Sequence, residues 1–231
     1  MFRGGIIMAR ITVILDEVID LSLNSNTGEP NPAKAAVLCE MAGCGGVAIQ
    51  IRDGNFTPRI ERTIKSIKDV LGIPLALIVS ADDKTIEKVV DLQPNLVILN
   101  NYISGGNDYI SRLQISNIIA ALEILPEIDQ VKASAKLKAD YVVIDTSSFC
   151  REKDLSARVD MLNKISKTAA LAERLSMGVA VAGPVMQTDL AKLAKIEQIE
   201  DFFIGHEVIS KAVLYGFEKA IAELKLEITG R

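Results

Sequence analysis

The stretch GVAIQIRDGNFTPRIERTIKSIKDVLGIPLALIV, residues 46–79, contains a complete strand–helix–strand unit. Its two ends, Gly46–Ile51 and Pro74–Val79, are short apolar runs typical of strands that are buried on both faces. The segment between them, Pro58–Leu71, has one apolar face with helical spacing. That face carries Ile60, Ile64, Ile67 and Leu71. Two buried strands joined by a helix predict parallel pairing through a right-handed crossover.

The same alternation of strand and helix runs through the rest of the chain. The other predicted strands are Ile11–Leu15, Asn95–Leu99, Ile118–Ile124, Tyr141–Ile144, Gly178–Ala182 and Phe202–Ile204. The other predicted helices are Ala33–Ala42, Asp82–Leu92, Tyr109–Ile115, Glu127–Lys138, Asp154–Ser176, Thr188–Lys195 and Glu207–Leu226. A polar loop is expected after the first strand, as far as Pro30. By periodicity alone, Ile118–Ile124 also fits a helix.

Eight such units predict an α/β fold, a (β/α)₈ TIM barrel that forms a single domain over residues 1–231. The alternative is an open, doubly wound parallel sheet. Residues 1–9 are expected to be a disordered or non-native leader, and both Met1 and Met8 are possible translation starts.

Composition argues against several classes of protein. The net charge of −4 leaves no basic surface for nucleic acid, and the apolar runs are far shorter than the ~20 residues that cross a bilayer. The three cysteines, Cys39, Cys44 and Cys150, have neither a disulfide framework nor the spacing of a zinc site. We therefore expect a cytoplasmic protein that binds no membrane and no metal.

A barrel of this type carries its function at the carboxyl ends of the strands. Gly183 follows the seventh strand and Gly205 the eighth, and a helix begins beside Gly205. Glycines allow backbone N–H groups to approach an anion, and a helix N-terminus attracts negative charge. We predict a phosphate-binding corner here, to which His206, the only histidine, contributes a side chain. The alternative is that both glycines only form tight turns.

Charged residues follow other strands. Arg52 and Asp53 come after the second strand and are candidate ligand-binding residues. Arg52 binds a phosphate in one interpretation and pairs with a neighbouring acid in the other. Asp16 is a candidate acid or base after the first strand; alternatively its carboxylate is hydrogen-bonded and orients the loop. Asp145 follows the sixth strand.

With these strand ends identified, the chain resembles the pyridoxine 5′-phosphate synthase family of vitamin B6 biosynthesis. The resemblance runs from about Ile11 to the C-terminus. It is carried by four stretches: Leu15–Asp53, with NTGEPNPAKAAVLCEMAGCGGVAIQIRD; PEIDQVKASAKLKADYVVIDT, Pro126–Thr146; GVAVAGP, Gly178–Pro184; and FIGHEVISKAVLYGFEKAI, Phe203–Ile221. The last of these is the most specific.

The resemblance implies a cofactor-free condensation of 1-deoxyxylulose 5-phosphate with 3-amino-2-oxopropyl phosphate, and assembly into a homo-octamer. It also implies a histidine after strand two, a glutamate on strand three and a histidine after strand seven. This chain carries Gln50, Ala76 and Pro184 at the positions we assign to them. Glu17 replaces another histidine, and Ser25 stands where the family has a loop arginine.

The substitutions suggest that the phosphate corner is kept while the family's proton-transfer groups are lost. Asp16, Glu17 and Asp145 are then the remaining candidate catalytic residues. Three interpretations stay open: a synthase-like protein with weak or no family activity, an enzyme with altered chemistry on another small phosphorylated metabolite, or a non-catalytic metabolite-binding or assembly partner. In each, we expect a homo-oligomer.

Overall fold

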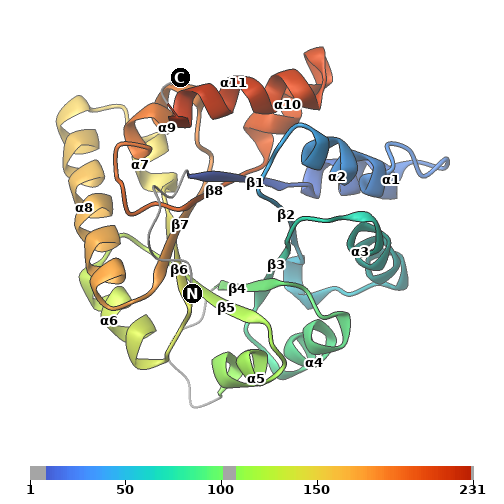
Figure 1. Ribbon diagram of the computed structural model, residues 1–231, viewed down its shortest axis with the longest axis horizontal. Helices are drawn as coiled ribbons and strands as arrows, with labels where there is room; N and C mark the ends of the chain where they lie inside the picture. Colours follow the sequence, from blue (N-terminus) through green and yellow to red (C-terminus); the bar gives the residue numbers. More distant parts are fainter. Residues whose placement is uncertain (1–8, 101–107, 230–231) are drawn as a thin grey trace.

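The computed structural model describes residues 9–100 and 108–229. Eight parallel strands are hydrogen-bonded in chain order, and the first strand also pairs with the last, so the sheet closes into a barrel. Figure 1 shows the strands at the centre with helices around them. The predicted TIM barrel is confirmed, and the open-sheet alternative is wrong. The leader expected at residues 1–9 lies outside the described residues except for Ala9.

The elements have the following bounds. The strands are β1 (Arg10–Ile14), β2 (Gly46–Gln50), β3 (Leu75–Ser80), β4 (Leu96–Asn100), β5 (Ile119–Ile124), β6 (Tyr141–Asp145), β7 (Gly178–Ala182) and β8 (Asp201–Ile204). The helices are α1 (Asp16–Asn24), α2 (Pro32–Met41), the 3₁₀ turn η1 (Arg52–Gly54), α3 (Pro58–Val70), α4 (Asp83–Leu92), α5 (Tyr109–Ile115), α6 (Ile128–Lys136), α7 (Ser147–Arg151), α8 (Leu155–Arg174), α9 (Gln187–Leu193), α10 (His206–Tyr215) and α11 (Phe217–Thr229).

Side chains on each strand alternate between the inside of the barrel and the layer of helices. The larger hydrophobic cluster lies between strands and helices and includes Val13, Leu77 and Phe202. The smaller cluster fills the barrel itself, and half of its buried members are alanines. These are Ala48, Ala76, Ala121 and Ala180. Because barrel interiors are usually filled by bulky branched side chains, Ala76, Ala121 and Ala180 leave space at one end of the barrel.

Three predicted segments differ from the structure. The polar loop after the first strand is wrong, because Asp16–Asn24 forms helix α1, with Val18, Ile19 and Ser22 buried. A second helix that was not predicted, α7, follows β6. The single last helix, Glu207–Leu226, is also wrong: Gly216 has φ of +88° and divides it into α10 and α11.

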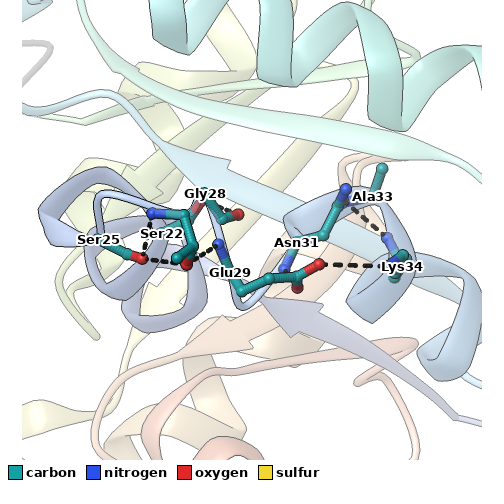
Figure 2. A network of polar contacts seen from close by, with 8 residues as sticks. Ser22, Ser25, Gly28, Glu29, Asn31, Ala33 and Lys34 are labelled. Carbon is teal, nitrogen blue, oxygen red and sulfur yellow. Dashed lines mark hydrogen bonds and ion pairs between the residues drawn. The ribbon is translucent and has the colours of Figure 1, made fainter.

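The connection between α1 and α2 is organised by short polar side chains (Figure 2). Asn31 caps α2 by accepting hydrogen bonds from the backbone of Ala33 and Lys34, and Pro32 occupies the first helical position. Glu29 accepts a hydrogen bond from Asn31 N–H and pairs with Lys34. The helix predicted at Ala33–Ala42 therefore begins one residue earlier, at Pro32.

A partly buried arginine joins the segments that follow β6 and β7. Arg158 on α8 donates hydrogen bonds to the carbonyls of Phe149 and Glu152 and forms an ion pair with Asp189 on α9. Its guanidinium also stacks on the Phe149 ring, 4.6 Å from the ring centre. Since Asp189 is only 1% exposed, the arginine supplies the charge that its carboxylate needs. This contact fixes two of the loops that border the C-terminal end of the barrel.

The three cysteines are unpaired and buried, and burial raises the pKa of each thiol. This agrees with the prediction that they form no disulfide framework. Within residues 9–100 and 108–229, no helix combines the length and the hydropathy needed to cross a membrane.

Candidate functional site

A cavity of about 290 Å³ opens at the carboxyl ends of the strands. Most of the residues singled out from the sequence line it: Asp16, Glu17, Gln50, Arg52, Gly183, Pro184, Gly205 and His206. They come from segments far apart in the chain, and barrel closure brings them together. Four further lining residues were not predicted: Ile14, Ile78, Glu123 and Ala182.

The two glycines of the proposed phosphate corner differ in backbone conformation and in the space around them. Gly183 has φ of +140°, and a Cβ there would lie 2.7 Å from Thr146 Oγ1. Gly205 caps α10 with negative φ, and a Cβ there would lie 3.2 Å from Ile14 Cβ. Gly183 therefore excludes a side chain where the chain turns beside the cavity, and at Gly205 a side chain would be tightly packed against Ile14.

The start of α10 presents backbone donors at this corner. The Gly205 carbonyl accepts hydrogen bonds from Val208 and Ile209, which begins the helix. The N–H groups of His206 and Glu207 have no backbone acceptor within the part of the chain that the structure describes. Glu207 does not oppose an anion here, since its carboxylate lies 3.9 Å from Lys211 Nζ and outside the cavity lining.

His206 is held by a carboxylate from another helix. Its Nδ1 lies 2.7 Å from Oε1 of Glu17 on α1, and the histidine side chain is largely exposed, at 78%. A hydrogen bond on Nδ1 fixes the ring orientation and leaves Nε2 for a ligand. Glu17 therefore acts on the candidate site through His206, a role that the sequence alone did not indicate.

Asp16 is the most perturbed acid of the cavity. Its Oδ1 accepts a hydrogen bond of 2.8 Å from the backbone N–H of Gln50. Burial raises the pKa of Asp16 to about 6, although that hydrogen bond and the charge of Arg52 act in the opposite direction. Both sequence interpretations fit: the carboxylate orients the backbone of β2, and it holds a proton near neutral pH, as acid–base groups do.

Arg52 and Asp53 separate in the structure. Arg52 lines the cavity and pairs weakly with Asp20 of α1, at 3.5 Å between Nη1 and Oδ2. Its side chain is 65% exposed, so this pair holds it only loosely. Asp53 has φ of +53° in η1, is exposed and does not line the cavity. Its assignment as a ligand-binding residue finds no geometric support.

The sequence did not indicate Glu123, because this residue lies within a predicted strand and not in the segment after it. It lies within β5, where the inward positions alternate as Ile119, Ala121 and Glu123. A single acid in an apolar strand is the signal that reveals it. Burial raises the pKa of Glu123, and the charge of Asp145 on β6 adds to this effect. Asp145 itself does not line the cavity; its Oδ1 accepts a hydrogen bond from Ser147 N–H at the start of α7.

The three positions assigned to the family's proton-transfer residues do not share one cavity. Gln50 and Pro184 line the C-terminal cavity. Ala76 lines a different cavity at the opposite end of the barrel, and Ile78 is the residue of β3 that faces the candidate site. The assignment of the family's strand-three glutamate to Ala76 is therefore not supported by the geometry. The residue that β3 does contribute to the candidate site, Ile78, is also apolar.

Comparison of the sequence with known proteins matches the chain to a family. Residues 103–230 match the family described as "Pyridoxal phosphate biosynthesis protein PdxJ". Over 233 aligned residues, the chain is 30% identical to a pyridoxine 5′-phosphate synthase of Geotalea daltonii, covering 94% of this chain and 97% of the relative. A second such synthase, from Geobacter metallireducens, is 29% identical over 94% of this chain and 97% of its own. The chain belongs to the PdxJ family.

Solved structures of other barrels share the fold. A 3-keto-L-gulonate-6-phosphate decarboxylase from Vibrio cholerae has a TM-score of 0.67 at 13% identity, covering 96% of this chain and 98% of its own. A phosphoribosylanthranilate isomerase from Thermotoga maritima has a TM-score of 0.63 at 9% identity, covering 97% of this chain. At these identities, the likeness concerns the barrel alone. The chemistry of this PdxJ family member must be argued from its own cavity.

We expect replacement of Asp16 with asparagine to change how stability depends on pH. The folded-state pKa of about 6 lies above the ordinary 3.8, so the native protein keeps a proton that the unfolded chain releases. Relative to Asp16→Asn, the wild type should lose up to about 3 kcal/mol of unfolding free energy as the pH rises from about 4 to about 7. Urea denaturation across this range measures the difference.

Asp16→Ala is the matched control. Asparagine keeps an acceptor for Gln50 N–H, whereas alanine removes both the acceptor and the charge. Both variants should lose the pH dependence, but Asp16→Ala should be less stable than Asp16→Asn at every pH. If the difference in unfolding free energy between the wild type and Asp16→Asn stays constant from pH 4 to pH 7, Asp16 ionises at its ordinary pKa.

Proposed function

We propose that this PdxJ family member binds a small phosphorylated metabolite in the C-terminal cavity, with the phosphate at the corner formed by Gly183, Gly205 and His206. The observation that carries the proposal is the free backbone N–H groups at the start of α10, beside glycines that keep side chains out. Arg52 lies on the same lining and is a further partner for a charged group of the ligand.

The family reaction itself is a separate question. We infer that the condensation of 1-deoxyxylulose 5-phosphate with 3-amino-2-oxopropyl phosphate is weak or absent here, because the cavity has an amide at Gln50, an imino-acid ring at Pro184 and an alkyl side chain at Ile78. None of these transfers protons efficiently. Such groups usually contribute about 10²–10⁴-fold each to an enzymatic rate.

The second candidate function is different chemistry on another phosphorylated metabolite. It is favoured by the carboxylates at Asp16 and Glu123, whose pKa values are both raised by burial. Raised pKa values suit carboxyl groups for acid–base work near neutral pH. No cofactor is needed in either proposal. We also infer that the protein acts in the cytoplasm, as expected from its composition.

Phosphate binding can be tested with inorganic phosphate and pyridoxine 5′-phosphate as probes. We expect both to raise the melting temperature of the wild type, because a ligand that binds only the native state stabilises it. Gly205→Val should weaken binding at least about tenfold, since the added methyl groups crowd Ile14 and the cavity edge. His206→Ala should weaken it only a few-fold, because the backbone donors remain. Calorimetric titration measures each affinity.

Gly28→Ala is the control for the phosphate-binding test. Gly28 also requires glycine, with φ of +73°, but it lies in the α1–α2 connection and does not line the cavity. This variant should be destabilised by backbone strain and should still bind phosphate. Equal affinity in the wild type and Gly205→Val would place the bound phosphate elsewhere.

The activity proposal makes a negative prediction. With the family's two substrates, we expect turnover at least about 10²-fold below the ~1–10³ s⁻¹ of ordinary enzymes. Introducing proton-transfer groups at the cavity positions, in the triple variant Gln50→His, Ile78→Glu and Pro184→His, should raise it. The same variant with Ala76→Glu in place of Ile78→Glu is the control, because Ala76 faces the other cavity. Ordinary turnover by the wild type would contradict the proposal.

We further infer that the chain forms a homo-oligomer, with an octamer as the family resemblance implies. Exposed apolar side chains on α10 favour this: Val213 is 75% and Leu214 is 79% exposed. The neighbouring aromatic residues Tyr215 and Phe217 are only partly exposed. Light scattering should find an oligomer for the wild type and a smaller species for Leu214→Glu. A monomeric wild type at micromolar concentration would contradict this inference.

A further inference from the structure

A second and larger cavity, of about 510 Å³, opens at the amino ends of the strands, opposite the candidate site. Its walls include Ala76, Ala121 and Ala180 from inside the barrel. Barrel interiors are normally packed with large branched side chains, and this end is the one that usually serves stability alone. The small residues instead leave a space of the size that binds small organic molecules.

Inside this cavity lies a buried carboxylate that is only partly satisfied. Asp201, at the start of β8, is 5% exposed. Its Oδ2 accepts a hydrogen bond of 3.0 Å from Thr12 Oγ1 and lies 3.2 Å from Arg10 Nη2. Its Oδ1 is buried and has no hydrogen-bond partner within the described chain. A buried acceptor without a donor costs about 1–3 kcal/mol, and more when it is charged.

The pKa of Asp201 points in the same direction. Burial raises it, although Arg10, Thr12 and the backbone of Phe202 oppose the change. The groups already present therefore do not compensate fully for removing this carboxylate from water. A further hydrogen-bond donor on Oδ1 would lower the free energy of its ionised form.

The wall beside Asp201 includes an aromatic side chain that is held by its neighbours. The Tyr141 ring lies against Gly178, where a Cβ would be only 2.1 Å from the ring, so the glycine makes room for it. The Tyr141 hydroxyl donates a 3.0 Å hydrogen bond to Glu200. Tyr141, Asp201 and Phe203 thus line one cavity.

Several other polar groups of the cavity have partners. Asn95 accepts a hydrogen bond from Leu75 N–H, and Lys68 donates one to the carbonyl of Leu92. Arg10 lies 3.2 Å from Asp201.

We propose that this cavity is a second ligand site, for a small molecule with an apolar body and a hydrogen-bond-donating head, either a hydroxyl or an ammonium group, bound at Asp201 Oδ1. The apolar body replaces the missing side-chain volume beside Ala76, Ala121 and the Tyr141 ring. The head supplies the donor that Asp201 lacks. This site is independent of the phosphate corner, because the two cavities share no lining residue.

Benzyl alcohol, benzylamine and toluene are suitable probes, since they share an apolar body and differ only in the head. We expect the wild type to bind at least one of the two donor-bearing probes at least tenfold more tightly than toluene in ligand-observed NMR titrations. Preference for benzylamine identifies an ammonium head, and equal or tighter binding of benzyl alcohol identifies a hydroxyl; both support the site. Failure of both donor-bearing probes to bind, or binding no tighter than that of toluene, overturns the proposal.

Variants locate the binding. Ala121→Leu should fill the cavity and abolish binding of all three probes, whereas Gly205→Val, at the other end of the barrel, should leave it unchanged. Asp201→Asn should reduce the preference for the donor-bearing probe at least tenfold and leave toluene binding unaltered. Binding that persists unchanged in Ala121→Leu overturns the proposal. If Ala121→Leu does not fold, a crystal of the wild type soaked in the tighter probe decides: its head must lie within hydrogen-bond distance of Asp201.

Discussion

Closure of the barrel is the constraint on which the other features depend. Strand β1 pairs in parallel with both β2 and β8, so the carboxyl ends of all eight strands lie at one end of the barrel. Because side chains alternate along a strand, one register decides which residues enter the interior at all eight strands. Gly183, Gly205 and Asp16 lie around one cavity for this reason, although they are far apart in the chain.

The same closure explains the cavity at the amino ends of the strands. Alanines occupy inward positions on β2, β3, β5 and β7, where larger side chains would complete the interior layers. Ile78, Ile98 and Phe203 are the larger members of the interior cluster and fill its middle. Their bulk leaves the two ends as separate spaces, so that a ligand at one end does not contact a ligand at the other. The chemistry of the two spaces also differs: backbone donors predominate at the carboxyl ends, and a buried acceptor lies at the amino ends.

The sequence predicted the barrel well because each strand is a short apolar run that ends at polar residues, a local pattern that needs no tertiary information. It failed where tertiary contacts decide. Asp16–Asn24 has a polar composition typical of a loop, yet packing of Val18 and Ile19 makes it helical. Gly216 could be seen in the sequence, but only its positive φ shows that it divides a helix. Glu123 and Ile78 depend on which strand positions face inward, and Ala76 was placed at the wrong end because the depth of a residue in the barrel requires the register.

The charges around the C-terminal cavity limit what it binds and how. Asp16, Glu17 and Glu123 supply acids, against which Arg52 and His206 are the basic side chains of the lining. Arg52 pairs only loosely with Asp20, and His206 contacts Glu17 through Nδ1 and keeps Nε2 for a ligand. Because three acids offset these two basic side chains, we expect the affinity for an anion to come mainly from the backbone donors at the start of α10. Such donors bind the oxygen atoms of a phosphate but contact little of the rest of the molecule, so we expect the acids of the same cavity to determine which metabolite binds.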